Sequence, residues 1–376
     1  MSSRWARAVA PFTAGVPVQA EEAAAPTDEA AAPARRDPAP PRVPSASSPA
    51  SSSTPGEPVS AQELSRPLNP SGDRVFPVVF GGSSFGWTIG DELAGALLDR
   101  YAHEGGNLVD VADSYASGRS EVMLGSWLRR RNAAGRFLVS TKVGRHPDAP
   151  GLGPVSLVRA VEASLTRLGV DRINQLYLHV DDSATRLEDV LGTVGWLIDS
   201  GKVGSLGVTS YSAERLVEAR VLAGAGYPLI TSLQLHYSLL TRDAFDGDTG
   251  LVARAQGLSV LSYFSLESGF LSGRYRQRQD LTASVRSTRA GAHLNRRGLR
   301  VLRALDRVAD EHGVAPATAA LAWVLGRQGI TGAIVGSSSV RQLDEAMAAA
   351  RLELSPRGRA ALDVAASGSS GRRRLP

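Results

Sequence analysis

Short apolar runs of strand length alternate with amphipathic helical stretches through most of this 376-residue chain. The strand-like runs cover residues 75–80, 108–111, 137–140, 175–178, 205–208, 231–235, 259–262 and 332–335. The clearest helical stretches between them cover residues 91–103, 155–168, 186–199, 213–223 and 340–350. Several of these stretches are followed by glycine, which commonly ends a helix. Eight strand–helix units over about 300 residues predict an α/β fold, a single-domain (β/α)8 TIM barrel.

The segments outside this alternation set the expected domain boundaries. Residues 1–62 are rich in Ala, Pro and Ser and predict a disordered extension, because they bury too little apolar surface to offset their chain entropy. The barrel is expected over residues 63–367 and a flexible tail over residues 368–376. Residues 316–327 predict an additional helix, whereas residues 275–295 lack apolar periodicity and predict a long loop. A doubly wound sheet is the alternative fold, but no G-x-G-x-x-G motif follows the first strand.

Composition excludes several classes of function. The formal charge is +5, but Lys142 and Lys202 are the only lysines and the arginines are spread along the chain, so we expect no nucleic-acid partner. The absence of cysteine excludes disulfides, thiol nucleophiles and cysteine–metal sites. No apolar run is long enough to span a bilayer. The basic N-terminus resembles a signal peptide, but Pro11 and Pro17 argue against one, so a cytoplasmic location is expected.

Polar residues of four chemical types lie at or just after the ends of successive predicted strands. Asp110 ends the second strand, Lys142 the third and His179 the fourth, and Tyr115 follows Asp110 by five residues. In a (β/α)8 barrel the carboxyl ends of the strands carry the catalytic groups. These four residues are therefore the candidate catalytic group of the chain.

The four residue types together suit the reduction of a carbonyl group. A carbonyl that accepts hydride develops alkoxide character and needs a proton. A phenol has an ordinary pKa near 10 and is a weak acid unless its anion is stabilised. A lysine beside Tyr115 stabilises a phenolate, a carboxylate keeps the lysine charged, and an imidazole orients the substrate oxygen. No metal is needed for this chemistry.

Each residue alone also has a structural interpretation. Asp110 is equally consistent with a helix cap and Tyr115 with packing. Lys142 is consistent with a surface ion pair or with the Schiff-base amine of a barrel lyase, and His179 with a hydrogen-bonded structural residue. The order D-x-x-x-x-Y, T-K and L-H, separated by strand–helix units, is much more specific than any of its parts.

The combined motifs resemble those of the aldo-keto reductase family over residues 68–362. Asp110, Tyr115, Lys142 and His179 stand where that family has its catalytic tetrad. Further similar segments are FGGSSFGW at 80–87, YASGRSE at 115–121, GVTSY at 207–211, SLQLHY at 232–237 and YFSLESGFLSGRY at 263–275. The Asp110 and Tyr115 positions and the serine segment at 336–339 argue against the Schiff-base lyase.

The resemblance implies a nicotinamide cofactor and residues to hold it. Gln234 and Ser210, with Thr209 beside them, are expected to hold the carboxamide, and Tyr263 to stack on the ring. The remaining cofactor-binding residues implied by the resemblance are Ser265, Leu266, Gly336, Ser337, Ser338, Arg341, Gln342 and Glu345. NADP(H) is favoured over NAD(H). Serines stand where the family often has a basic residue, and Arg341 is expected to supply the positive charge that they lack.

The expected function is NAD(P)H-dependent reduction of an aldehyde or ketone to an alcohol, with Tyr115 as the proton donor. The partner is a small-molecule carbonyl substrate. Two alternatives stay open: a reductase of nucleotide-linked keto-deoxysugars, and a non-enzymatic cofactor-sensing subunit that resembles potassium-channel β subunits. The physiological substrate and the oligomeric state do not follow from the sequence.

Overall fold

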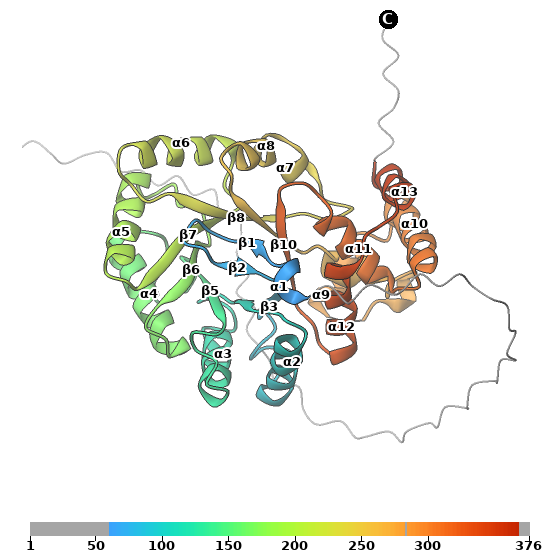
Figure 1. Ribbon diagram of the computed structural model, residues 1–376, viewed down its shortest axis with the longest axis horizontal. Helices are drawn as coiled ribbons and strands as arrows, with labels where there is room; N and C mark the ends of the chain where they lie inside the picture. Colours follow the sequence, from blue (N-terminus) through green and yellow to red (C-terminus); the bar gives the residue numbers. More distant parts are fainter. Residues whose placement is uncertain (1–59, 283, 368–376) are drawn as a thin grey trace, which may run out of the picture. The chain divides into compact units, whose positions relative to one another are not determined.

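The computed structural model of the chain describes residues 60–282 and 284–367. Eight parallel strands close into a barrel in the order β10-β3-β4-β5-β6-β7-β8-β9. They are β3 (Val78–Gly81), β4 (Leu108–Asp110), β5 (Leu138–Val143), β6 (Ile173–Leu178), β7 (Val203–Thr209), β8 (Ile230–His236), β9 (Ser259–Tyr263) and β10 (Ile330–Val335). Helices surround these strands (Figure 1). The fold is the predicted (β/α)8 TIM barrel.

The helices that follow successive barrel strands pack their apolar faces inward. They are α2 (Asp91–His103), α3 (Arg119–Arg130), α4 (Pro154–Leu168), α5 (Leu187–Asp199), α6 (Ala213–Gly224), α8 (Asp248–Ala255), α11 (Pro316–Leu325) and α12 (Val340–Ala348). Helix α4 is typical: Leu157, Val161, Leu165 and Leu168 are buried at a spacing of three to four residues, which is the helical period. Gly169, with φ of 65°, ends this helix in the left-handed conformation that glycine adopts without strain.

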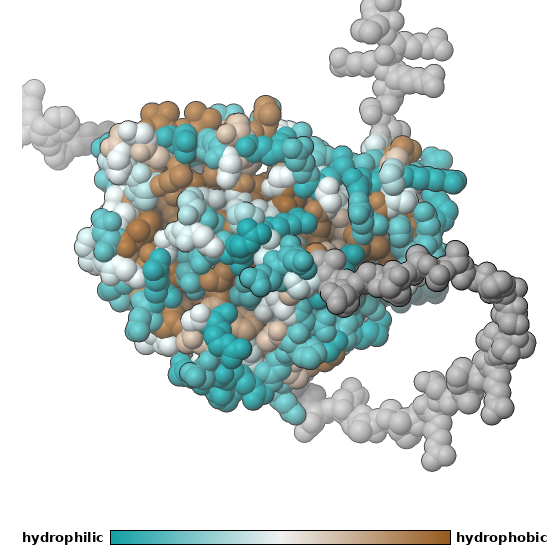
Figure 2. Space-filling view, in the orientation of Figure 1, coloured by the Kyte–Doolittle hydropathy of each residue, from teal (hydrophilic) through white to brown (hydrophobic). Residues whose placement is uncertain are grey.

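Further helices, most of them short, complete the described part of the chain. They are α1 (Ala61–Leu64), α7 (Asp243–Asp246), η1 (Glu267–Ser272), η2 (Arg278–Asp280), α9 (Val285–Gly291), α10 (Arg296–His312), η3 (Ala349–Arg351) and α13 (Pro356–Ala366). Helix α11 is the additional helix predicted over 316–327. Within residues 60–282 and 284–367, no helix is both long enough and apolar enough to cross a bilayer. On the face shown in Figure 2, hydrophobic residues are divided by hydrophilic ones.

A hairpin of β1 (Arg66–Pro67) and β2 (Arg74–Val75) lies at the end of the barrel where the strands begin. Asn69 in its turn donates a hydrogen bond to Ser205 near the start of β7, at 3.0 Å. The hydroxyl of Ser259, the first residue of β9, donates to the carbonyl of Pro67 at 3.0 Å. In Figure 1 the two strands lie across the middle of the ring of barrel strands.

This hairpin corrects the first predicted strand. Val75 belongs to β2, whereas the barrel strand begins at Val78. Pro77 stands between them and has no N–H to donate to a sheet, so the apolar run 75–80 is divided into two elements.

Two further segments differ from the sequence-based expectation. Residues 60–62, assigned to the extension, belong to the start of α1, where Ser60 and Glu63 form a reciprocal capping box. The predicted loop 275–295 contains η2 and α9, which are too short to show an apolar period. The rest of the predicted extension and the predicted tail 368–376 lie outside the described residues.

Candidate active site

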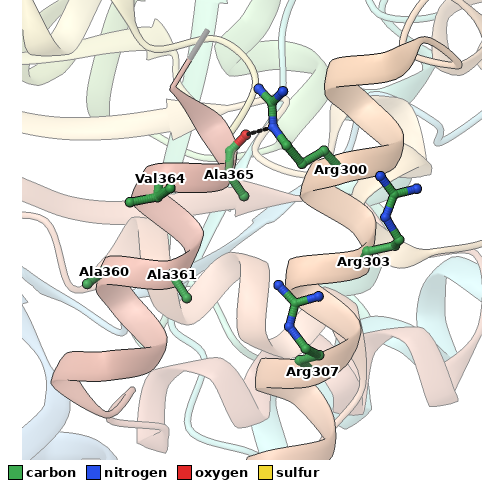
Figure 3. Close-up of a pocket in the computed structure, with 7 residues that line it drawn as sticks. All are labelled: Arg300, Arg303, Arg307, Ala360, Ala361, Val364 and Ala365. Atoms are coloured by element: carbon green, nitrogen blue, oxygen red, sulfur yellow. Dashed lines mark hydrogen bonds between the residues drawn. The ribbon is translucent and has the colours of Figure 1, made fainter. Parts of the chain in front are cut away.

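A cleft of about 1090 Å³ opens where the barrel strands end, and every residue that the sequence assigned to the site lines it. The four tetrad positions lie at or just after the carboxyl ends of β4, β5 and β6, and the predicted cofactor residues lie at or after those of β7, β8, β9 and β10. A second cavity, of about 410 Å³, lies between α10 and α13, where Arg300 donates to the carbonyl of Ala365 (Figure 3). That cavity contains none of the predicted site residues, so the larger cleft is the candidate active site.

Lys142 is the centre of the hydrogen-bond network in this cleft. Its Nζ lies 2.5 Å from Oδ2 of Asp110, 3.0 Å from the carbonyl oxygen of Val111 and 3.3 Å from Oη of Tyr115. Burial by itself lowers the pKa of Lys142, but the charge of Asp110 and the neighbouring Tyr115 outweigh it and hold the pKa above its usual value. Lys142 is therefore a buried ammonium that contacts the phenol of Tyr115.

Strand register explains why these side chains meet. Asp110 is the last residue of β4 and pairs with Ser140 of β5, which places Lys142 two residues further toward the cleft on the same face. Asp110 also accepts hydrogen bonds from the hydroxyl of Ser140 at 2.7 Å and from Nε2 of Gln234 at 2.8 Å. A carboxylate with three donors is firmly oriented toward Lys142.

Tyr115 is held by a tight loop between β4 and α3. Ala116, Ser117 and Gly118 have φ values of 48°, 53° and 83°, in the left-handed region that ordinary residues seldom adopt. The loop is anchored by Glu121 in the first turn of α3, which is fully buried and accepts from Thr141 at 2.5 Å and from Arg167 at 2.6 Å. Backbone strain of this kind persists where the surroundings determine the conformation.

His179 directly continues β6, and its backbone N–H donates to the carbonyl of Val143 at 2.9 Å. Its ring lies edge-on to the ring of Tyr115, with the ring centres 6.0 Å apart. Burial, reinforced by the charges of Lys142 and Arg145, lowers the pKa of His179 to about 3. At neutral pH this imidazole is uncharged, so it donates or accepts a hydrogen bond but is not a proton reservoir.

The predicted nicotinamide residues lie beside this cluster. The hydroxyls of Ser210 and Tyr263 are 3.0 Å apart, and the Tyr263 ring stacks on His236 with the ring centres 5.7 Å apart. The Thr209 hydroxyl donates to the carbonyl of Leu178, so it already has a partner inside the barrel. Oε1 of Gln234 is buried and, among the described residues, has no hydrogen-bond partner, which leaves an acceptor for a ligand amide.

The predicted phosphate segment forms the turn between β10 and α12. Ser339 caps α12 by accepting from the N–H of Gln342 at 3.3 Å, and Ser338 donates to the Gln342 side chain from both its N–H and its hydroxyl. The buried Ser337 hydroxyl has no partner within the part of the chain that the structure describes. Arg341 is largely exposed and pairs with Glu345 at 2.5 Å. An anion is well accommodated at the start of a helix such as α12.

Ser265 and Leu266 follow β9 instead. The hydroxyls of Ser265 and Ser262 are 2.8 Å apart and hydrogen-bond to each other.

Four arginines in the cleft were not among the predicted site residues: Arg145, Arg274, Arg286 and Arg289. Arg286 and Arg289 lie one helical turn apart on α9, inside the segment expected to be a loop. The sequence contained one signal for this pair, the spacing of three residues between the arginines. That spacing brings two side chains to the same face only in a helix, and the segment was predicted to be a loop. Across residues 60–282 and 284–367, no cluster of three or more His, Asp or Glu is arranged to hold a metal ion.

The fold and the cleft define a barrel protein with an acid–base cluster at its mouth and room for an extended ligand. The family model described as the aldo/keto reductase family matches residues 77–366. The chain belongs to this family, whose members are oxidoreductases that act on carbonyl compounds with nicotinamide cofactors.

Individual relatives share the length of the barrel. The chain is 30% identical over 275 residues to "Aldo-keto reductase str7" of Strobilurus tenacellus, which covers 72% of this chain and 80% of the relative. It is 25% identical over 276 residues to "Aldo-keto reductase yakc [NADP(+)]" of Schizosaccharomyces pombe, covering 70% and 80%. It is also 30% identical over 298 residues to a "Probable voltage-gated potassium channel subunit beta" of Oryza sativa subsp. japonica, covering 75% and 89%.

Proposed function

We propose that this protein reduces an aldehyde or ketone to an alcohol with NADPH, and that Tyr115 is the proton donor. The observation that carries the proposal is the contact of Lys142 with both Asp110 and the hydroxyl of Tyr115. When bound, a reduced nicotinamide would supply the hydride that the carbonyl carbon accepts. The carbonyl oxygen then takes a proton from the Tyr115 hydroxyl, and the phenolate that remains is stabilised by the Lys142 ammonium.

His179 has a different role in this proposal. Its pKa of about 3 leaves it neutral at physiological pH, so it cannot supply the proton. A neutral imidazole beside Tyr115 instead donates a hydrogen bond that holds the carbonyl oxygen near the phenol. Asp110 acts through Lys142 by keeping the ammonium charged and oriented.

The residues present fit a nicotinamide dinucleotide. The free acceptor of Gln234 suits a carboxamide N–H, and the exposed face beside Tyr263 suits an aromatic ring. We assign the phosphates to the segment from Gly336 to Arg341, with Ser337 among its donors. The cations Arg274, Arg286, Arg289 and Arg341 support NADP(H) over NAD(H), as does NADP(+) in the name of the Schizosaccharomyces pombe relative. A cytoplasmic location suits an enzyme that uses this cofactor.

Turnover tests this function directly. The purified full-length chain is mixed with NADPH and a panel of aldehydes and ketones, and the loss of NADPH absorbance is followed. We expect saturable reduction of at least one carbonyl compound, and tighter binding of NADPH than of NADH. Absence of turnover with every compound, together with tight NADPH binding, would instead favour a cofactor sensor. The similarity to the rice channel subunit is the observation that keeps this second function open.

A further inference from the structure

One cation in the cleft follows a different barrel strand from the predicted cofactor residues. Arg145 follows β5, the strand that carries Lys142, and it lines the same cleft as Tyr115 and His179. The other four arginines of the cleft all follow β9 or β10 in the chain: Arg274, Arg286, Arg289 and Arg341. The segments after β9 and β10 carry the proposed phosphate contacts. Arg145 is thus placed on the wall where the substrate is expected.

No acidic residue forms a recorded ion pair with Arg145 in the described ranges, although Asp113 accepts a hydrogen bond from the N–H of the neighbouring Gly144. Asp110 is paired with Lys142. Asp181 is paired with Arg215 at 2.9 Å, and Asp182 accepts hydrogen bonds from the N–H of Leu152 and the hydroxyl of Thr185. The structure records no ion pair or side-chain hydrogen bond for Arg145 within residues 60–282 and 284–367. Its guanidinium therefore has its donors available to a ligand.

The loop that carries Arg145 is closed by hydrogen bonds at its base. Gly144 has a φ of 111°, and a Cβ there would lie 2.8 Å from the side chain of Leu152. The N–H of Gly144 donates to Asp113 at 3.2 Å, and its carbonyl accepts from Gly151 at 3.0 Å. These contacts hold the backbone next to Arg145 in place, so the fold itself positions Arg145 at the cleft.

Trp87 supplies a complementary surface. It lies in the loop after β3, lines the same cleft and has 60% of its surface exposed. An indole face offers apolar contact to the body of a ligand, whereas a guanidinium binds carboxylate or phosphate oxygens in pairs. Trp87 and Arg145 line the same cleft and together suit a ligand that carries both an apolar or planar part and an anionic group.

We infer that Arg145 binds an anionic group of the substrate, so that the preferred substrates are aldehydes or ketones that also bear a carboxylate or a phosphate. This inference rests on the proposed reductase function and specifies its substrate class. Arg145 acts on specificity: it fixes the distal end of the substrate while the carbonyl lies at Tyr115. A nucleotide-linked keto-deoxysugar, the alternative substrate named above, belongs to the phosphate-bearing group.

Matched pairs of substrates test the inference. One pair is para-carboxybenzaldehyde and its methyl ester, and the other is glyceraldehyde phosphate and glyceraldehyde. We expect kcat/KM to favour the charged member of at least one pair about tenfold or more, and Arg145→Gln to reduce kcat/KM for that member by about 10- to 100-fold. The neutral members should change less than about threefold. The pair that responds identifies carboxylate or phosphate as the anion.

Two further variants sharpen the result. Arg145→Lys keeps the charge without the paired donors and should fall between wild type and Arg145→Gln. Arg172→Gln is the charge-matched control, because Arg172 is exposed and directly precedes β6, at the opposite end of the barrel. We expect this control to match wild type with all four compounds.

The outcomes separate this inference from the proposed function. If wild type reduces both members of each pair equally and Arg145→Gln changes neither, the anion inference is wrong and the reductase stands. If wild type reduces nothing, the reductase proposal fails, and benzoate and inorganic phosphate are titrated against the NADP-saturated protein by tryptophan fluorescence. Binding that Arg145→Gln weakens tenfold supports the anion site, and equal binding by both proteins overturns it.

Discussion

At the scale of single residues, the contacts of Lys142 decide what the cleft can do. The sequence order predicted Asp110, Tyr115, Lys142 and His179 as a group, because each lies at or just after the end of a predicted strand, and strand ends meet at one face of a barrel. The hydrogen bond that Gln234 donates to Asp110 was not predictable, since these residues are 124 positions apart in the chain and share no local pattern. The same limit applies to Arg145. Its proposed role depends on the absence of an ion-pair partner, which only the three-dimensional arrangement of the described residues reveals.

Replacing Lys142 by methionine tests the charge at this position. The variant removes the ammonium that contacts Tyr115 and leaves Asp110 buried without its partner. We expect kcat to fall by about 10²- to 10⁴-fold, and stability to fall by about 3 kcal/mol because a buried charge loses its counterion. Stopped-flow turnover and thermal denaturation measure the two effects. Lys202→Met, at a partly exposed lysine, is the control and should retain kcat.

Ionisation of Asp113 lowers the free energy of unfolding as the pH rises. Burial, with the neighbouring charge of Glu121, raises the pKa of Asp113 to about 6, and Oδ1 has no partner among the described residues. Because the folded state then binds more protons than the unfolded chain between about pH 4 and pH 6, this carboxyl group destabilises the fold as pH rises through that window.

Asp113→Asn should therefore stabilise the protein at neutral pH. The expected gain is at most about 3 kcal/mol near pH 7.5, and it should vanish near pH 4, where the wild-type carboxyl is also neutral. Thermal melting of both proteins at the two pH values measures it. A variant that is equally stable or less stable at pH 7.5 would contradict the assignment of Asp113 as a strained buried acid.

At the scale of elements, one carboxylate holds the segment that follows β9. Glu267, at the start of η1, is buried and accepts hydrogen bonds from the Ser238 hydroxyl, from Thr241 at 2.7 Å and from His236 at 3.0 Å. His293, just before α10, lies 3.2 Å from its other oxygen. Burial alone raises the pKa of Glu267, but the hydrogen bonds hold it far below its usual value. The network joins the ends of β8 and β9 to the segment that carries Arg286 and Arg289.

Glu267→Gln should weaken cofactor binding more than chemistry. The amide keeps the size of the side chain but loses the charge that these donors share, at a cost of about 1–3 kcal/mol. We expect the NADPH dissociation constant to rise by about tenfold or more, with kcat at saturating NADPH changed less than about threefold. Fluorescence titration and steady-state kinetics separate these quantities. Glu218→Gln, on the exposed face of α6, should change neither.

Apolar periodicity predicted some of the long helices but not all of them. Helices α2, α4, α5, α6 and α12 and most barrel strands followed from it, whereas α10, at 17 residues, was not among the predicted helical stretches. The division of 75–80 at Pro77 and the helices inside 275–295 did not follow from it either, because a two-residue strand and a seven-residue helix contain too few residues for a period to stand out. Those short elements are part of the hairpin at the start of the barrel and the helix that carries two cleft arginines. Sequence pattern therefore failed at positions where tertiary contacts determine the structure.

At the scale of the whole molecule, the part of the chain that the structure describes begins with the cap of α1 at Ser60. Ala61 and Leu64 pack against the core, and Ser60 caps their helix. Composition predicts a disordered extension over residues 1–62, and because Ser60 caps α1 we expect residues 1–58 to contribute nothing to the stability of the barrel. Deleting them should leave the melting temperature and kcat unchanged, whereas deleting residues 1–65 removes α1 and should lower the melting temperature by several degrees. A loss of stability in the shorter deletion would show that the predicted extension packs on the barrel.

The most direct test of the proposed chemistry is the turnover of Tyr115→Phe on the best carbonyl substrate found. The substitution keeps the ring beside Lys142 and His179 and removes only the hydroxyl that Lys142 contacts at 3.3 Å. We predict that the rate of a single turnover falls by about 10²- to 10⁴-fold while the NADPH dissociation constant stays within about twofold of wild type. Near-native turnover by this variant would contradict the assignment of Tyr115 as the proton donor, and with it the mechanism proposed for this cleft.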